Sequence, residues 1–238
     1  MKLEHLPLNV ADTTSVLFVP DSIIPIYGFN FMIEGDFDGD GGKESLIERY
    51  YSSVTKMETN KFYKGLDSYE QLVEYTVAKK PISFAVCTNN TIDTLRFGNN
   101  YQLFGLAYLK NEGDLNGDGT DEVSYVINRA DWSNINTWNI ATYTKGSWEE
   151  FYSFQIYDWQ IPELPIRPEV RLSVTAEEAR EKAVADSIYR VRRTELSIFG
   201  GLVKKINNQK LSIIGINEDA ELDTMVVQIN PFIKRTNR

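Results

Sequence analysis

The sequence predicts a mainly β protein, α+β overall, with one or two helices at about residues 68–80 and 175–192. Short segments rich in Val, Ile, Phe and Tyr recur along the chain, separated by Gly, Pro, Asn and Asp, as in strands joined by turns. The chain has 238 residues, of which 42% are hydrophobic. It is therefore long enough to bury a core as one large domain or two small ones.

The N-terminal part of the chain reads as short strands and loops. Residues 14–34 have strand composition, and Pro20 and Pro25 divide them into short pieces. A loop rich in glycine and aspartate follows at 35–44. Residues 45–64 are rich in aromatic and β-branched side chains but show no clean alternation of apolar and polar residues, so they are harder to assign.

The first predicted helix covers residues 68–80. Ser68 is a capping residue with Gln71 at the third helical position. Leu72, Val73 and Val77 share roughly one face, and Pro81 ends the helix.

Strand patterns return after Pro81 and continue to about residue 156. Single strands are expected at 82–88, 93–98, 102–110 and 122–130. A second glycine and aspartate loop occupies 113–122. Residues 137–156 predict a hairpin whose two-residue turn is centred on Gly146 and Ser147.

The C-terminal part predicts a linker, a helix and further strands. Prolines at every third position favour an extended linker at 161–172. The helix after it starts with a capping box of Thr175 and Glu178. A hairpin turning at Asn207 and Asn208 and a last strand at 222–233 follow. The expected organisation is a β-rich body, the linker, and a C-terminal part packed on the body, with boundaries 1–160, 161–172 and 173–238.

Composition excludes several classes of function. The formal net charge is −9, which argues against a nucleic-acid partner, because phosphate backbones bind basic surfaces. No apolar run is long enough for a transmembrane helix. A single cysteine, Cys87, allows no internal disulfide, and the lone His5 allows no mechanism that needs two histidines. No nucleophile–base pattern or phosphate loop stands out, so we expect no enzyme activity.

The two glycine and aspartate loops match each other position by position. We call residues 35–44 the first loop and residues 113–122 the second loop. Positions are counted from Asp36 in the first loop and from Asp114 in the second. Each loop then has oxygen-bearing side chains at positions one, three and five, a glycine at six and a glutamate at nine. The residue at position seven can offer its backbone carbonyl. The candidate metal ligands are Asp36, Asp38, Asp40, Gly42 and Glu44 in the first loop, and Asp114, Asn116, Asp118, Thr120 and Glu122 in the second.

This spacing indicates calcium. Ca²⁺ prefers about 6–8 oxygen ligands in a flexible arrangement, whereas Mg²⁺ demands a rigid octahedron. Without an ion the crowded carboxylates would repel one another. An EF-hand would also need a glutamate at position twelve, where this sequence has Ile47 and Tyr125. The sequence therefore predicts two Ca²⁺ sites in loops between strands.

The segments around both loops resemble a known repeat. The second loop lies in FGLAYLKNEGDLNGDGTDEVSYVI and the first in YGFNFMIEGDFDGDGGKESLI. Both are similar to the FG-GAP or VCBS-type repeat of integrin α propellers and many bacterial surface proteins. The resemblance implies strand–calcium loop–strand units, a partial propeller at most, and the ligands named above. Glutamate at position nine departs from the usual aspartate. The whole chain is also similar to uncharacterised proteins of Bacteroidetes-type bacteria.

These observations favour a calcium-stabilised, non-catalytic binding module of the bacterial envelope or exterior, with a protein partner. Residues 1–10 show no signal peptide, so a periplasmic, cell-surface or secreted location requires a signal already removed, and the cytoplasm is the alternative. One alternative function is an immunity-type protein that neutralises a basic toxin. The other is carbohydrate binding, which Trp132, Trp138, Trp148 and Trp159 suggest.

Overall fold

A computed structural model describes residues 24–26, 30–59, 61–64, 69–97, 103–129, 133–162 and 201–229. Strands make up 57% and helical segments 8% of this part, so the prediction of a mainly β fold is confirmed. The predicted linker at 161–172 and helix at 175–192 fall almost entirely outside the described residues.

Three antiparallel sheets build the described part of the molecule. A five-stranded sheet has the order β2-β3-β6-β7, with β4 also paired to β3. Its strands are β2 (Met32–Gly35), β3 (Glu44–Ser52), β4 (Met57–Glu58), β6 (Pro81–Cys87) and β7 (Leu95–Arg96). A separate two-stranded ladder joins β1 (Ile24–Ile26) to β5 (Phe62–Lys64).

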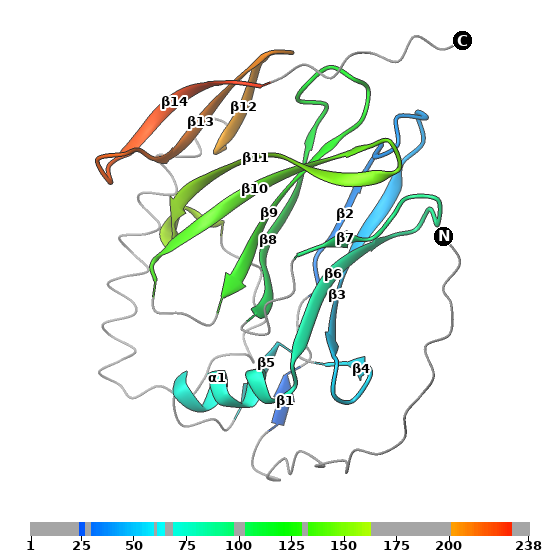
Figure 1. The fold of residues 1–238 in the computed structure, drawn as a ribbon, viewed down its shortest axis with the longest axis vertical. Coiled ribbons are helices and arrows are strands. Elements are labelled where there is room, and N and C mark those ends of the chain that lie inside the picture. Colours follow the sequence, from blue (N-terminus) through cyan, green and yellow to red (C-terminus); the bar gives the residue numbers. More distant parts are fainter. Residues whose placement is uncertain are drawn as a thin grey trace.

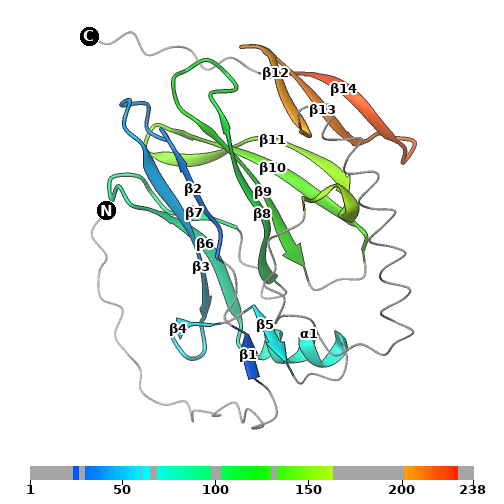
Figure 2. The same cartoon turned by 180° about the vertical axis from the view of Figure 1, so that it is seen from behind.

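The four-stranded sheet lies between the other two (Figures 1 and 2). It has the order β11-β10-β9-β8, and β8 contacts β2 and β6 while β11 contacts β13. Its strands are β8 (Leu103–Gly113), β9 (Glu122–Arg129), β10 (Ile135–Thr144) and β11 (Ser147–Tyr157). The third sheet consists of β12 (Val203–Asn207), β13 (Lys210–Ile216) and β14 (Leu222–Gln228).

Helical structure is sparse in the described segments. The predicted helix at 68–80 is present as α1 (Tyr69–Ala78), and a short 3₁₀ turn, η1 (Asp158–Gln160), follows β11. No helix in this part of the chain is long and apolar enough to cross a membrane.

Two hydrophobic clusters join the three sheets. One lies between the four-stranded and three-stranded sheets and includes Trp138, Ile156 and Ile213. The other lies between the five-stranded and four-stranded sheets and includes Phe37, Leu46 and Val123. Residues 201–229 therefore share a core with the central sheet.

A buried ion pair adds a polar connection between the five-stranded and four-stranded sheets. The Lys61 ammonium donates to both carboxylate oxygens of Glu48, at 2.7 and 2.6 Å. The same carboxylate accepts the backbone N–H groups of Phe31 and Leu106, at 3.1 and 2.8 Å. Glu48 is fully buried and Lys61 is 3% exposed, so this charged pair is inside the protein. Glu48 thus fixes β3 to β8.

Both predicted hairpin turns are shifted by one residue. Thr144 pairs with Ser147, so the first turn is Lys145-Gly146 rather than Gly146-Ser147. Both turn residues have positive φ, at 53° and 85°, as a two-residue I′ turn requires. Asn207 likewise pairs with Lys210, which places the second turn at Asn208 and Gln209 rather than at Asn207 and Asn208. The last strand ends at Gln228 within the described residues.

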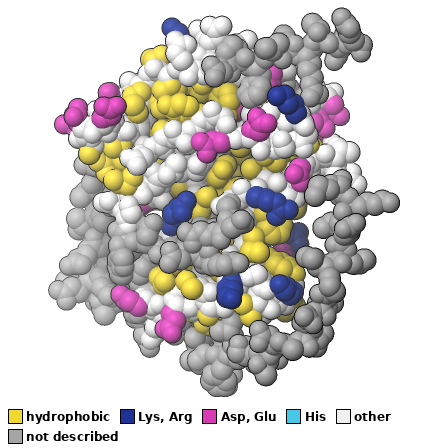
Figure 3. Space-filling view, viewed as in Figure 1, with side chains coloured by type: hydrophobic (Ala, Val, Ile, Leu, Met, Phe, Trp, Pro, Cys, Tyr) yellow, Lys and Arg dark blue, Asp and Glu magenta, His cyan; other side chains and the backbone are white. Residues whose placement is uncertain are grey.

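The third sheet carries an exposed apolar area. Figure 3 shows hydrophobic side chains gathered over the sheet of β12–β14. Ile206, Leu222 and Val226 contribute to this sheet's exposed hydrophobic surface, and Val226 is 61% exposed.

Candidate metal centre

Both loops connect the two strands of an antiparallel hairpin. The first loop joins β2 to β3, where Gly35 pairs with Glu44. The second loop joins β8 to β9, where Gly113 pairs with Glu122. The two loops lie at the same end of the molecule, away from α1 (Figures 1 and 2). The glutamate at position nine is therefore the first residue of the returning strand in both loops.

The first aspartate of each loop organises the turn that follows it. The carboxylate of Asp36 accepts the N–H groups of Gly39 and Gly41, at 2.9 and 3.0 Å. The carboxylate of Asp114 accepts the N–H groups at the same two positions of the second loop, from Gly117 and, at 3.2 Å, from Gly119. Positions one, four and six are thus equivalent in the two loops.

Positions three and five repeat a second pattern. Asp38 accepts the N–H of Asp40 at 3.2 Å, and Asp40 accepts the N–H of Gly42 at 2.6 Å. The equivalent bonds of the second loop join Asp118 to Asn116 at 2.7 Å and Thr120 to Asp118 at 2.9 Å. In both loops the side chains at positions three and five are therefore held against the backbone two residues ahead, as in other Asx turns.

Glutamate at position nine is anchored in the same way in both loops. Glu44 accepts the N–H of Phe37 at 3.1 Å, and Glu122 accepts the N–H of Leu115 at 2.6 Å. Phe37 and Leu115, the residues at position two, are both buried and anchor each loop to the hydrophobic core. The longer side chain of glutamate reaches across the loop from the returning strand.

Glycine at position six is required by the backbone, as the sequence predicts. Gly41 has a φ of 88° and Gly119 a φ of 98°, a region that L side chains disfavour. A Cβ atom at either residue would meet nothing within 4 Å, so the requirement is conformational rather than steric.

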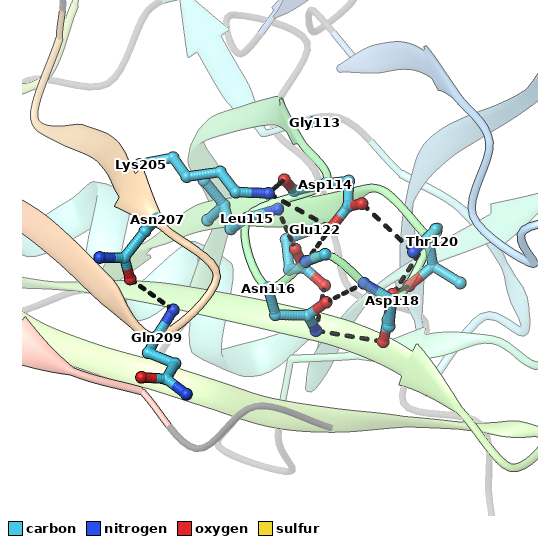
Figure 4. Close-up of polar contacts among 12 residues, drawn as sticks. Gly113, Asp114, Leu115, Asn116, Asp118, Thr120, Glu122, Lys205, Asn207 and Gln209 are labelled. Carbon is cyan, nitrogen blue, oxygen red and sulfur yellow. Dashed lines mark hydrogen bonds and ion pairs between the residues drawn. The ribbon is translucent and has the colours of Figure 1, made fainter. Parts of the chain in front are cut away.

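The structure brings the three aspartates of the first loop together, whereas the acidic residues of the second loop form no equally close group among the described residues. One carboxylate oxygen from each of Asp36, Asp38 and Asp40 lies within 4.8 Å of the others, close enough to hold a metal ion. In the second loop the side-chain amide of Asn116 donates to Asp118 and to Glu122, both at 3.1 Å (Figure 4). Thr120 turns its hydroxyl to Asp118 at 2.7 Å, in addition to its backbone bond.

The two glutamates lie in environments that disfavour a negative charge. Burial raises the pKa of Glu122 to about 8; the Leu115 N–H and the Thr142 hydroxyl oppose this rise, and the charges of Asp118 and Asp114 add to it. Burial also raises the pKa of Glu44; the Phe37 N–H opposes this rise, and the three aspartates of the loop add to it. A cation bound beside these carboxylates would favour their ionised form.

A buried hydroxyl lies beside the second loop. Thr142 of β10 is fully buried, and its hydroxyl oxygen makes no hydrogen bond of good geometry within the described residues. It is nevertheless near enough to lower the pKa of Glu122. Thr142 therefore places one further oxygen beside Glu122, in addition to the predicted ligands of the second loop.

The surroundings of the two loops differ. The hairpin of β12 and β13 covers the second loop, and the Lys205 ammonium donates to the backbone carbonyl of Asp114 at 2.7 Å (Figure 4). A Cβ atom at Gly117 would lie 2.1 Å from the side chain of Asn208, so this contact is close. The first loop is instead contacted by Asn89, whose amide donates to Asp38 at 3.0 Å.

Sequence reasoning did not identify the residues that support the loops from a distance. Lys205 and Asn89 reach the loops from other elements, and no local pattern marks them. Asn111 precedes the second loop and bonds to Glu34 of β2, while Asp121 belongs to the second loop and bonds to Asp36 of the first. Only Asp121 carries a local signal, as an acidic residue inside the loop.

The described tryptophans mostly serve packing. Trp138 is 2% exposed and lies in the core. Trp148 donates its indole N–H to the Asp93 carbonyl at 2.8 Å, and Trp159 stacks on Tyr157. Trp132 lies outside the described residues. No exposed row of aromatic rings is formed by these three tryptophans.

Comparison with known proteins adds no assignment, because no family model, no curated protein and no solved structure matches this chain.

Proposed function

We propose that this protein is a calcium-stabilised, non-catalytic binding module in which each of the two loops holds one Ca²⁺ ion. The observation that carries the proposal is the repetition of five equivalent hydrogen bonds in two loops from distant parts of the sequence. Asp-Gly turns are common, but two independent turns would not be expected to share this whole pattern.

The donor set favours calcium over other metals. Both loops offer carboxylate and carbonyl oxygens, the second loop adds the amide oxygen of Asn116, and neither predicted set includes a nitrogen or sulfur ligand, which suits a hard cation. Three side chains, one carbonyl and the glutamate supply five or six oxygens, and water would complete the shell. Because Ca²⁺ accepts irregular coordination whereas Mg²⁺ demands a near-ideal octahedron, Ca²⁺ fits a set of side chains fixed by the loop backbone better than Mg²⁺.

The ions would act on the fold rather than on a reaction. Each would tie the end of one strand to the start of the next and offset the repulsion among the acidic side chains. Ca²⁺ sites of modest affinity fill outside the cytosol. We therefore favour a periplasmic, cell-surface or secreted location and a protein partner. The net charge of −9 supports the immunity-type alternative, but no feature of the loops does, and the carbohydrate alternative gains no support from the described tryptophans.

Thermal unfolding tests the proposal. The protein is unfolded in EDTA, in millimolar Ca²⁺ and in millimolar Mg²⁺. A ligand at a hundred times its dissociation constant adds about 2.7 kcal/mol per site. Each kcal/mol raises the midpoint by about 2–4 °C for a protein of this size. We expect a Ca²⁺-selective rise of about 5–10 °C for each filled site.

Two variants make this test specific. Asp118→Ala removes one ligand of the second loop and should reduce the Ca²⁺-dependent rise. Asp219→Ala removes an acidic residue from the turn between β13 and β14, away from both loops, and should leave the rise unchanged. The same midpoint in EDTA and Ca²⁺, together with a metal-free purified protein, would refute the calcium sites.

A further inference from the structure

The two loops are bonded to each other by a reciprocal pair of hydrogen bonds. The N–H of Asp36 donates to the carboxylate of Asp121 at 3.1 Å. The N–H of Asp121 donates in return to the carbonyl of Asp36 at 2.8 Å. Position one of the first loop is therefore fixed, through its backbone, by position eight of the second loop.

Asn111, just before the second loop, supports this connection. Its side-chain amide donates to the carboxylate of Asp121 at 2.8 Å and to the carbonyl of Glu34 at 2.8 Å. Its side-chain oxygen accepts the N–H of Gly113 at 2.7 Å. Asn111 thus connects the ends of both hairpins and holds the Asp121 carboxylate in place.

The loops are also in direct contact. A Cβ atom at Gly39 would lie 3.1 Å from a methyl carbon of Thr120 and 3.3 Å from the carbonyl oxygen of Gly119. A Cβ atom at Gly35 would lie 2.5 Å from the amide nitrogen of Asn111. The backbone of the first loop is thus closely packed against the second loop at Gly39 and against Asn111 at Gly35.

Consecutive residues of the second loop act on different loops. Glu122 bonds to the N–H of Leu115 in its own loop, whereas Asp121 bonds to Asp36 of the first loop. Because the two residues share a peptide bond, ordering of Glu122 restricts the backbone that carries Asp121. The first loop has Lys43 at the equivalent position, so it supplies no matching carboxylate.

We propose that Asp121, which belongs to neither predicted ligand set, is a positioning residue for the cation site of the first loop and makes cation binding at the two loops positively cooperative. This inference rests on the cation sites proposed above. A cation in the second loop orders residues 118–122 and thereby holds the Asp121 carboxylate against Asp36. The first loop then loses less conformational freedom when it binds its own ion.

The expected coupling can be bounded. Coupling between two sites typically changes affinity by about 5–150-fold, and it acts equally in both directions. One charge-assisted hydrogen bond with a packed contact belongs at the low end of this range. We expect about tenfold.

Calcium binding by the EDTA-stripped full chain tests the inference, measured by isothermal titration calorimetry. The wild-type protein should bind Ca²⁺ with positive cooperativity. In Asp118→Ala, which lacks the second site, the first loop should bind Ca²⁺ about tenfold more weakly than it does beside a filled second site. In Asp121→Ala the two sites should bind independently, and a further Asp118→Ala change should leave the affinity of the first loop unaltered.

Asp121→Asn is the matched control. It removes the same negative charge as Asp121→Ala but keeps a side-chain oxygen that can accept the Asp36 N–H. Cooperativity retained in Asp121→Asn and lost in Asp121→Ala supports positioning. Equal loss in both variants assigns the effect to charge and overturns the inference, as do two independent sites in the wild type. No Ca²⁺ binding at all would overturn the proposed function as well, so the two failures are distinguishable.

Discussion

Removing the Glu48 carboxylate should strongly destabilise the protein, because this group connects the two hairpins that carry the loops. Glu48 lies on β3 and bonds to Leu106 on β8, while Lys61 neutralises its charge. The pKa of Lys61 is lowered by burial, although Glu48 opposes that shift. The pair is therefore held inside the protein against a desolvation penalty, and each partner depends on the other.

The magnitude follows from what each substitution leaves behind. Glu48→Ala leaves the Lys61 ammonium, 3% exposed, without a counter-charge, which costs about 3–5 kcal/mol. It also removes the carboxylate that accepts the N–H group of Leu106, at a further cost of about 1–3 kcal/mol. These costs overlap, so we expect a loss of at least about 4 kcal/mol. Glu48→Leu with Lys61→Met removes both charges and should cost less than Glu48→Leu alone.

Urea denaturation followed by circular dichroism measures these free energies of unfolding. The surface pair of Arg49 and Glu58, with both side chains more than 40% exposed, provides a control. Its Glu58→Ala change should cost at most about 1 kcal/mol. If Glu48→Ala also costs less than 1 kcal/mol, or if the double change costs more than Glu48→Leu alone, the buried pair does not hold the hairpins together.

Three further changes test other parts of the structure. Burial lowers the pKa of Lys79 from 10.5 to about 7, so the folded state binds fewer protons than the unfolded state between about pH 7 and pH 10.5. The Lys79 contribution should make the free energy of unfolding rise with pH in this window, and Lys79→Met should flatten that slope in denaturation series at several pH values. Lys205→Met should strengthen Ca²⁺ binding at the second loop up to about fivefold at low salt, because the Lys205 ammonium lies 3.9 Å from an Asp114 carboxylate oxygen and repels a cation bound there. Calorimetry measures the change in affinity. The control Lys204→Met, at an exposed lysine of the same strand, should change the affinity less than twofold. Gly119→Ala should lower the free energy of unfolding by about 1–2 kcal/mol, because the φ of 98° at this residue disfavours an L side chain. Gly119→Asn should lower it less, because Asn tolerates positive φ better than Ala. The thermal midpoint measures both changes, and equal losses would argue against a backbone cause.

Much of the fold could be predicted because its signals are local. Strand composition and turn residues predicted the mainly β class, and capping and a terminal proline predicted α1. The spacing of oxygen-bearing residues and glycines predicted two equivalent loops between strands. The positive φ of Gly41 and Gly119 agrees with the sharp turn expected at position six.

β3 shows why one strand was hard to assign. Its residues alternate strictly between buried and partly buried along the whole strand. The sequence hides this alternation, because the buried face includes Glu44, Glu48 and Ser52 as well as Leu46 and Tyr50. A buried polar residue looks like a surface residue until its partners are known, and the partners of Glu48 lie on other strands or loops.

The connections between the loops could not be predicted for a related reason. Asn111 and Asp121 act on Glu34 and Asp36, which are far away in the sequence and become neighbours only when β8 packs beside β2. Lys205 reaches the second loop from the C-terminal sheet in the same way. Local spacing identifies candidate ligands, whereas the residues that position them depend on sheet packing.

Calcium stoichiometry tests the central claim most directly. The EDTA-stripped protein is dialysed to equilibrium against Ca²⁺ in the presence of excess Mg²⁺, and bound calcium is measured by elemental analysis. We expect two Ca²⁺ per wild-type chain and a clear loss of bound Ca²⁺ in Asp40→Ala and in Asp118→Ala. A wild-type chain that binds no Ca²⁺, or binding that neither substitution reduces, would contradict the assignment of the two loops as cation sites.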